Sequence, residues 1–171
     1  MHPCYQSSVV TLRCTQKLLR RLNTSPVPAP VPPSTRLGDW YAKLLFTRPT
    51  QLVLCASERT LLPVVIQARE INTLVPRFRN ALRELLLALG IHEGAVEDEE
   101  CAMADLAFGK TDNRRVLGSM NDFAWMLEGY LHDPMSLLEL SLRLAETPCG
   151  PLNMNNPERA TTDLFSSRPH D

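Results

Sequence analysis

The sequence lacks the long hydrophobic run that a membrane-spanning helix needs. Nowhere among its 171 residues do about eighteen apolar residues follow one another, although about twenty are required to cross a bilayer. The first residues, MHPCYQSS, also lack the basic flank and the apolar segment of a secretory signal. We therefore expect a soluble, cytoplasmic protein with no membrane partner.

Cysteine is present, but without the spacing of a metal site or of a disulfide framework. The five cysteines lie far apart, form no CxxC pair and have no histidine at ligand spacing. Structural zinc sites combine cysteines and histidines at short, regular spacings. An odd number of cysteines fits reduced thiols in a cytosolic chain. We predict no metal site and no cofactor, and we interpret the cysteines as buried or incidental.

Familiar catalytic motifs are also missing. The chain contains no GxSxG, no GxxxxGK and no HExxH, which mark serine hydrolases, phosphate-binding loops and zinc proteases. His132 is followed by Asp133, but Asp133 is expected to cap a helix. The sequence therefore neither supports an enzymatic activity nor excludes one.

Neither sign of charge is in excess, but the charges are unevenly distributed. The formal net charge is −1, with basic residues prevailing in 1–60 and acidic residues in 91–112. Dedicated nucleic-acid binders usually keep an uncompensated basic surface, so a nucleic-acid partner is not favoured, although the basic residues leave it open. The acidic run 97–100 lacks the alternating spacing of a calcium loop, and we predict a solvated loop.

Short apolar runs in the first half of the chain predict strands. Residues 9–14 have the β-branched composition of a strand, and 51–57 and 61–68 predict two strands of an antiparallel meander. Residues 37–46 fit either a strand or a helix. Pro63 places its run at a sheet edge or at a bulge, because proline cannot donate a hydrogen bond to a neighbouring strand.

Apolar residues repeat at helical spacing in four other segments. Thr111 or Asp112 is expected to cap the third of them and Asp133 the fourth. Between the second and the third, residues 94–109 are acidic and only weakly apolar, and we predict a loop with a strand fragment. The predicted helices are 16–22, 73–89, 111–131 and 134–146.

Together these elements predict an α+β fold in which a small antiparallel sheet packs against three or four helices. We expect residues 1–150 to form a single domain, because 44% apolar residues can fill one core in a chain of this length. The proline-rich segment 25–34 is expected to run as an extended strap. Residues 151–171 are expected to form a polar, flexible tail.

The stretch TDNRRVLGSMNDFAW holds the most distinctive polar residues. On the predicted helix 111–131, apolar residues occupy one side and polar residues line up on the other. Arginine binds carboxylate or phosphate, asparagine donates and accepts hydrogen bonds, and glycine permits close approach. The helix amino terminus adds a partial positive charge that favours an anion. The candidate ligand- or partner-binding residues are Asn113, Arg114, Gly118, Asn121, Asp122 and Trp125.

The same residues also have a structural interpretation, which the sequence leaves open. Arg114 and Asp122 could bond other parts of the fold, and Gly118 could admit a crossing strand. Polar groups in proteins usually hydrogen-bond to one another. Whether the row binds a ligand or ties the fold together depends on its exposure.

From these residues we expect a noncatalytic interaction or regulatory module that binds a partner protein or an anionic ligand. The alternative is a nucleic-acid-associated enzyme or accessory factor that contacts phosphates through its basic residues. For that alternative the phosphate contacts would be Lys17, Arg20, Arg21 and Arg115.

Three motifs resemble one known family. LGDWYAKLL, ERTLLPVV and NRRVLGSMNDF are similar to motifs of short bacterial proteins known only as a domain of unknown function, and the resemblance covers roughly residues 9–146. Family members usually have a serine where this chain has Arg115, and commonly an asparagine where it has Lys43. The resemblance implies a bacterial cytosolic protein with one α+β domain and no established biochemical role. It also implies a family motif made of Asn113, Arg114, Gly118, Asn121 and Asp122.

Overall fold

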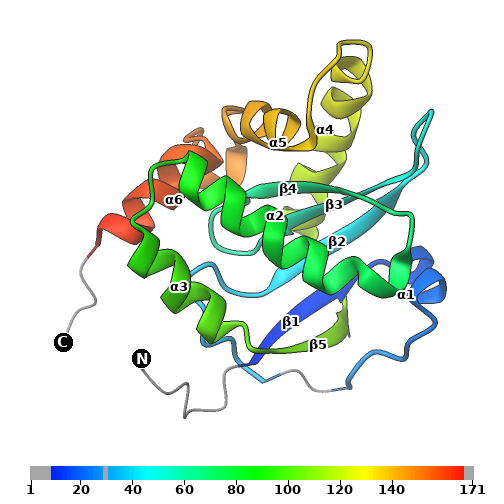
Figure 1. The fold of residues 1–171 in the computed structure, drawn as a ribbon, viewed down its shortest axis with the longest axis horizontal. Helices are drawn as coiled ribbons and strands as arrows, with labels where there is room; N and C mark the ends of the chain where they lie inside the picture. The colour runs from blue at the N-terminus through cyan, green and yellow to red at the C-terminus, as the bar shows by residue number, and fades with distance from the viewer. Residues whose placement is uncertain (1–8, 29–30, 168–171) are drawn as a thin grey trace.

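A mixed β-sheet with helices on both of its faces forms the centre of the protein (Figure 1). The computed structural model describes residues 9–28 and 31–167. Within them the strand order is β4-β3-β2-β1-β5. The strands are β1 (Val9–Cys14), β2 (Trp40–Leu45), β3 (Leu52–Ser57), β4 (Pro63–Gln67) and β5 (Asp105–Lys110).

The strand directions confirm the α+β class and correct the predicted sheet. β2, β3 and β4 form the expected antiparallel meander, whereas β1 pairs in parallel with β2 and with β5. The sheet is therefore mixed, because helical crossovers return the chain to the same end of the sheet before β2 and before β5. Pro63 opens β4 at a sheet edge, as predicted.

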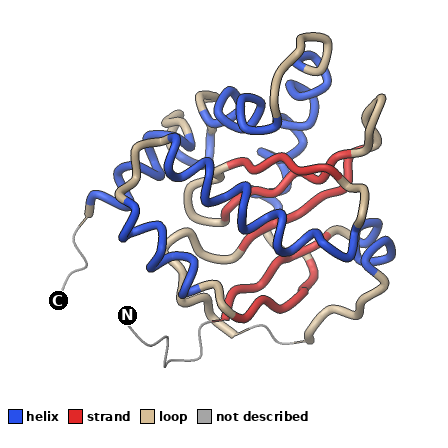
Figure 2. The backbone as a smooth tube through the Cα atoms, in the orientation of Figure 1, coloured by secondary structure: helices blue, strands red, loops and turns tan. Residues whose placement is uncertain are grey.

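The helices cover the two faces of the sheet unequally (Figure 2). The first three pack on one face and α4 packs on the other, over β2 and β3, whereas α5 lies along the edge strand β4 and contributes to both cores. None of the described helices combines the length and the apolar character that crossing a membrane requires. The helices are α1 (Gln16–Leu22), α2 (Leu74–Ala88), α3 (Glu93–Ala102), α4 (Arg114–Tyr130), α5 (Leu137–Ala145) and α6 (Pro157–Ser166).

The sheet has a hydrophobic core on each of its faces, and side chains of β2 contribute to both. Nearly all residues of β2 are therefore buried. Successive side chains of a strand point to opposite faces of the sheet. Trp40 and Leu44 pack against the α1–α3 side, and Tyr41 and Leu45 pack against α4 and α5. On the α1–α3 side, the rings of Trp40 and Phe78 pack edge to face, with their centroids 5.0 Å apart.

The acidic segment is helical, so the loop predicted within 94–109 is wrong, whereas the strand fragment predicted there is confirmed as β5. Residues 93–102 form α3, and 105–110 form β5. Glu99 points inward and is only 3% exposed, and its carboxylate accepts hydrogen bonds from the backbone N–H groups of Arg36 (3.0 Å) and Leu37 (3.1 Å). Like-charged neighbours on a helix spread around it, so one carboxylate can be buried while the adjacent ones stay in water.

The predicted caps of α4 and α5 lie a few residues too early. Asn113 rather than Thr111 or Asp112 caps α4. Ser136 rather than Asp133 caps α5, in a capping box with Glu139. Both helices begin where a side chain bonds the free N–H groups of the first turn, and several residues in each linker are chemically able to do so.

The segments expected to be irregular contain ordered contacts. In the strap, the Val27 N–H donates to the Phe108 carbonyl at 2.8 Å, so this part lies beside β5; residues 29–30 lie outside the described residues. The tail holds α6, whose buried Thr161 donates to Thr60 at 2.9 Å, which corrects the expectation for 157–166. Residues 168–171 of the tail lie outside the described residues.

Ser141 is expected to protect the edge strand β4. Its hydroxyl accepts a hydrogen bond from the buried Val65 N–H at 3.0 Å. Ser141→Ala would leave that N–H without a partner, so the free energy of unfolding should fall by about 1–3 kcal/mol in urea denaturation. Ser166→Ala is the matched control, because both hydroxyls donate to the carbonyl four residues earlier but Ser166 bonds no strand. Equal effects of the two changes would contradict the role of Ser141.

Candidate functional site

The amino terminus of α4 is built by Asn113. Its Oδ1 accepts hydrogen bonds from the backbone N–H groups of Arg115 (3.0 Å) and Val116 (3.4 Å). This cap satisfies donors that have no partner inside the helix. Asn113 therefore has a structural role, and by starting the helix it sets the positions of Arg114 and Arg115.

A pocket of about 280 Å³ lies between α4 and the segment 147–151 that follows α5. We call it the α4 pocket. Arg114 and Arg115 line it from the first turn of the helix, Gly118 and Ser119 from the second, and Asp122 from the third. The sequence prediction therefore brought Arg114, Gly118 and Asp122 together correctly.

Four polar side chains of the α4 pocket make no hydrogen bond or ion pair within the described residues. Arg114, Arg115 and Asp122 are exposed, and none of their side chains makes a hydrogen bond or an ion pair within the described residues. Ser119 is only 7% exposed, yet its hydroxyl also has no partner in that part of the chain. These groups therefore form no structural network with one another, and they are open to water or to a ligand.

The other two candidates on α4 lie outside this pocket. Asn121 accepts a hydrogen bond from the Lys43 amino group at 2.7 Å, which ties α4 to β2. Trp125 is 78% exposed, two turns after Gly118 on the same side of the helix. Tryptophan is enriched among the residues that dominate protein interfaces, so Trp125 stays a candidate contact residue.

Gly118 has no packing role in the fold, and this gives a stability prediction. A Cβ atom added there would meet no atom within 4 Å, and the same holds for Gly129 on the same helix. Gly118→Ala should therefore raise the free energy of unfolding by about 0.5–1 kcal/mol through helix propensity. Chemical denaturation measures the change, with Gly129→Ala as the control. A loss of stability at Gly118 alone would show that the fold needs the glycine.

The predicted phosphate contacts do not form one surface. Lys17, Arg20 and Arg21 lie on α1, whereas Arg115 lies on α4, on the opposite face of the sheet. The Lys17 amino group lies 5.4 Å from the centre of the Phe46 ring, and an Arg21 Nη1 donates to Gln51 at 3.2 Å.

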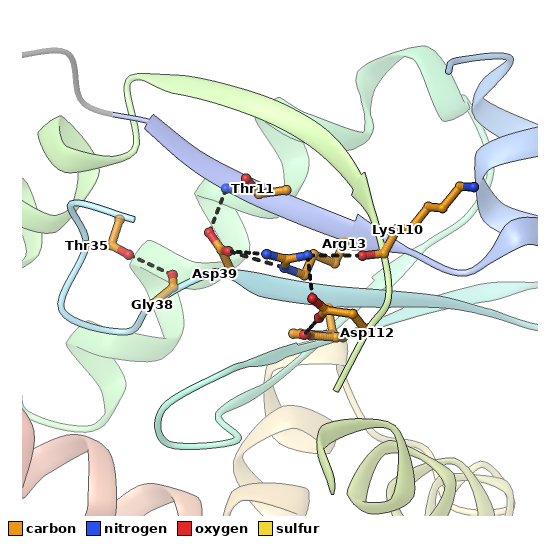
Figure 3. A network of polar contacts seen from close by, with 8 residues as sticks. Thr11, Arg13, Thr35, Gly38, Asp39, Lys110 and Asp112 are labelled. Atoms are coloured by element: carbon orange, nitrogen blue, oxygen red, sulfur yellow. Dashed lines mark hydrogen bonds and ion pairs between the residues drawn. The ribbon is translucent and has the colours of Figure 1, made fainter. Parts of the chain in front are cut away.

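A second group of polar residues, absent from the sequence prediction, lies at the carboxyl end of β1 (Figure 3). We call Arg13, Asp39, Tyr41 and Asp112 the Arg13 cluster. The Arg13 Nε and Nη2 atoms both lie 3.2 Å from Asp39 Oδ2. The Thr11 N–H donates to the other Asp39 oxygen at 3.0 Å. The buried Asp39 carboxylate therefore accepts hydrogen bonds from the backbone of Thr11 and from the side chain of Arg13, both in β1.

Asp112 joins the Arg13 cluster from the β5–α4 connection. One of its oxygens accepts from the Tyr41 hydroxyl at 2.6 Å, and the other lies 3.2 Å from Arg13 Nη1. Burial raises the pKa of Tyr41, and the hydrogen bond to Asp112 and its negative charge add to the rise, so Tyr41 stays a neutral donor. The Asp112 side chain is still 65% exposed and keeps lone pairs for a further donor.

Burial disfavours the reactive thiolate form of the buried cysteines among the described residues. Burial raises the pKa of Cys14 to about 12 and that of Cys149 to about 11, and it also raises the pKa of Cys55. A thiol that does not ionise is a poor nucleophile. Among the described residues no group of histidine, cysteine, aspartate or glutamate side chains is arranged to hold a metal ion.

Comparison with known proteins identifies a family but no activity. A family model with the description Domain of unknown function (DUF6933) matches residues 11–160. This range includes both the α4 pocket and the Arg13 cluster. No curated protein and no solved structure matches the chain.

Proposed function

Because the chain belongs to the family of the domain of unknown function DUF6933, whose description names no activity, we propose a function from the geometry of α4. The protein is a noncatalytic interaction module, and the outer side of α4 docks an acidic segment of a partner protein. A carboxylate of that segment pairs with Arg114 and Arg115 at the end of the α4 pocket formed by the first turn of the helix, about two turns before Asp122. As part of the same proposal, we place the protein in the bacterial cytoplasm.

One observation carries the proposal: two arginines that form no ion pair within residues 9–28 and 31–167 stand beside a pocket on the same helix as an exposed tryptophan. Guanidinium groups bind carboxylates through paired hydrogen bonds. The amino terminus of α4, a helix of 17 residues, adds its own attraction for an anion. The unpartnered Ser119 hydroxyl can donate a further hydrogen bond inside the pocket.

Trp125 favours a protein partner over a small anion. A small ligand held in the α4 pocket would not explain a side chain that is 78% exposed and is not among the residues that line the pocket. Tryptophan and arginine are the residues most enriched among those that dominate the energy of protein interfaces. Arg114, Gly118 and Trp125 follow one another along about three turns of α4, which is the length that a short docked segment would cover.

Binding of a labelled acidic peptide tests the proposal. In fluorescence anisotropy, a fluorescein-labelled peptide rich in glutamate and aspartate should bind the full chain, and Arg114→Gln/Arg115→Gln should weaken binding at least tenfold. Lys17→Gln/Arg21→Gln is the matched control, because it removes the same charge from two exposed residues of α1. Neither double variant should change the melting temperature appreciably, since the replaced residues are exposed. Equal losses in the two double variants would contradict docking at α4.

A labelled DNA oligonucleotide in the same assay tests the alternative, a nucleic-acid-associated function. Phosphate binding weakens steeply as salt rises. An oligonucleotide that bound more tightly than the acidic peptide, and lost affinity in Lys17→Gln/Arg21→Gln, would replace the proposal by a nucleic-acid-associated function. We expect no such binding, because the four basic residues are divided between the two faces of the sheet.

A further inference from the structure

The chain leaves the sheet in opposite directions at the carboxyl ends of β1 and β5. After β1 it enters α1, which packs on the face with α2 and α3, and after β5 it enters α4 on the other face. The two strands are parallel neighbours. In sheets of this kind, a crevice that binds ligands forms where adjacent connections diverge to opposite faces.

Two hollows meet at this point, on either side of Lys110. One, of about 510 Å³, is lined by Arg13, Asp112, Lys110 and the strap residues 26–28, and we call it the inner hollow. The other, of about 340 Å³, is lined by Lys110, Pro26 and residues of α1 and its following turn, and we call it the outer hollow. Both have Lys110 and Pro26 in their walls, so the two hollows adjoin at these residues.

The outer hollow has the chemistry of a phosphate site. Arg20 and Lys110 line it, and neither side chain forms an ion pair or hydrogen bond within the described residues. Gln16 and Asn23 add amide donors, and no acidic residue contributes to the wall. Figure 3 shows the Lys110 amino group turned away from the Arg13 cluster, toward α1. Paired cationic side chains with amide donors are the groups that hold phosphate oxygens.

The inner hollow has the chemistry of a hydroxyl site. Its exposed acceptor is Asp112, which is fixed in place by Tyr41 and Arg13. A carboxylate held in this way accepts hydrogen bonds from the hydroxyl groups of a sugar. Arg13 contributes no free charge here, because its guanidinium already bonds Asp39, Asp112 and the Lys110 carbonyl. A second phosphate would therefore be repelled by Asp112, whereas a neutral polyol fits.

We propose that this crevice binds a phosphorylated sugar, with the phosphate between Lys110 and Arg20 and the sugar hydroxyls on Asp112. The ligand is either a free sugar phosphate or a 5′-mononucleotide, since both share this chemistry. The site is separate from the α4 pocket, whose lining residues are different. It stands independently of the docking function proposed for α4.

Isothermal titration calorimetry with the full chain tests the crevice. Ribose 5-phosphate should bind at least tenfold more tightly than ribose or inorganic phosphate, because only the intact ester reaches both hollows. Lys110→Met should weaken ribose 5-phosphate and inorganic phosphate alike. Asp112→Asn should weaken ribose 5-phosphate but leave inorganic phosphate unchanged. An AMP titration distinguishes the two sources, since tighter binding than that of ribose 5-phosphate assigns the crevice to nucleotides.

Two control variants distinguish binding in the crevice from a general effect of charge and from binding at the α4 pocket. Lys17→Met removes a charge from α1 at a residue that lines neither hollow and should leave ribose 5-phosphate binding unchanged. Arg114→Gln should also leave it unchanged, so failure of this proposal does not affect the α4 pocket. Absence of ribose 5-phosphate binding, or binding that Lys110→Met does not weaken, would overturn the proposal.

Discussion

Asp39→Ala is expected to lower the free energy of unfolding by about 3–5 kcal/mol, the usual cost of removing one partner from a buried ion pair. The Asp39 side chain is only 3% exposed and that of Arg13 only 15%. Removing the carboxylate leaves the Arg13 guanidinium inside the fold with one counter-charge fewer. The same change leaves the buried Thr11 N–H without its acceptor. Guanidinium chloride denaturation at neutral pH measures the loss.

Two further variants show whether the buried ion pair is the cause. Asp39→Asn keeps an acceptor for the Thr11 N–H and removes only the charge, so its effect should lie between those of the wild type and Asp39→Ala. Asp105→Ala removes an exposed aspartate at the start of β5 and should change stability by less than about 0.5 kcal/mol. If Asp39→Ala cost no more than Asp105→Ala, the Arg13 cluster would not hold β1 and β2 together.

Glu99→Ala is expected to have the second large effect, about 1–3 kcal/mol at neutral pH, because it leaves two backbone N–H groups without their acceptor. These N–H groups belong to Arg36 and Leu37, where the chain turns from the strap toward β2. Glu99 thus joins α3 to residues that lie 63 and 62 positions earlier in the chain. Glu97→Ala, an exposed position on the same helix, is the control and should be nearly neutral.

The effect of Glu99→Ala should also depend on pH, with a defined sign. Burial raises the pKa of Glu99 above its ordinary value of 4.5, and the two backbone hydrogen bonds offset only part of the rise. As pH increases through the interval between the unfolded and the folded pKa, the unfolded chain loses a proton that the folded chain still holds. The stabilisation by Glu99 is therefore complete below the unfolded pKa and declines as pH rises through the folded pKa.

Denaturation of both proteins from about pH 4 to neutral pH measures this difference, because the other carboxyl groups affect wild type and variant alike. The loss of stability in Glu99→Ala should be largest at the acidic end and smaller at neutral pH. A loss that increased with pH would mean that the hydrogen bonds outweigh burial and that the pKa of Glu99 is lowered in the fold.

The periodicity of apolar residues predicted the elements that pack against others close to them in the sequence. The strands β2, β3 and β4 follow one another through short turns, and α2 and α4 each bury one continuous apolar stripe. The pairing of β1 with β5 was missed because it joins residues 9–14 to 105–110. Nothing in the composition of either segment identifies so distant a partner, and Gly109 and the charged ends of β5 weaken its strand pattern.

The same limit applies to the candidate sites. Arg114, Gly118 and Asp122 are spaced so that one side of a helix presents them together, and the structure places all three at the α4 pocket. Arg13 and Asp39 stand alone in apolar segments, and only the parallel pairing of β1 with β2 brings them into contact. A charged residue within or directly before an otherwise apolar strand is the signal that could have pointed to them, since such a charge needs a partner.

Acrylamide quenching of tryptophan fluorescence tests most directly whether the outer side of α4 is a docking surface. The protein has two tryptophans; Trp40 is fully buried and Trp125 is 78% exposed, so quenching reports on Trp125. Addition of the acidic peptide should lower the quenching constant of the wild type and leave that of Arg114→Gln/Arg115→Gln unchanged. A peptide that binds the wild type while Trp125 stays equally open to acrylamide would contradict docking on α4.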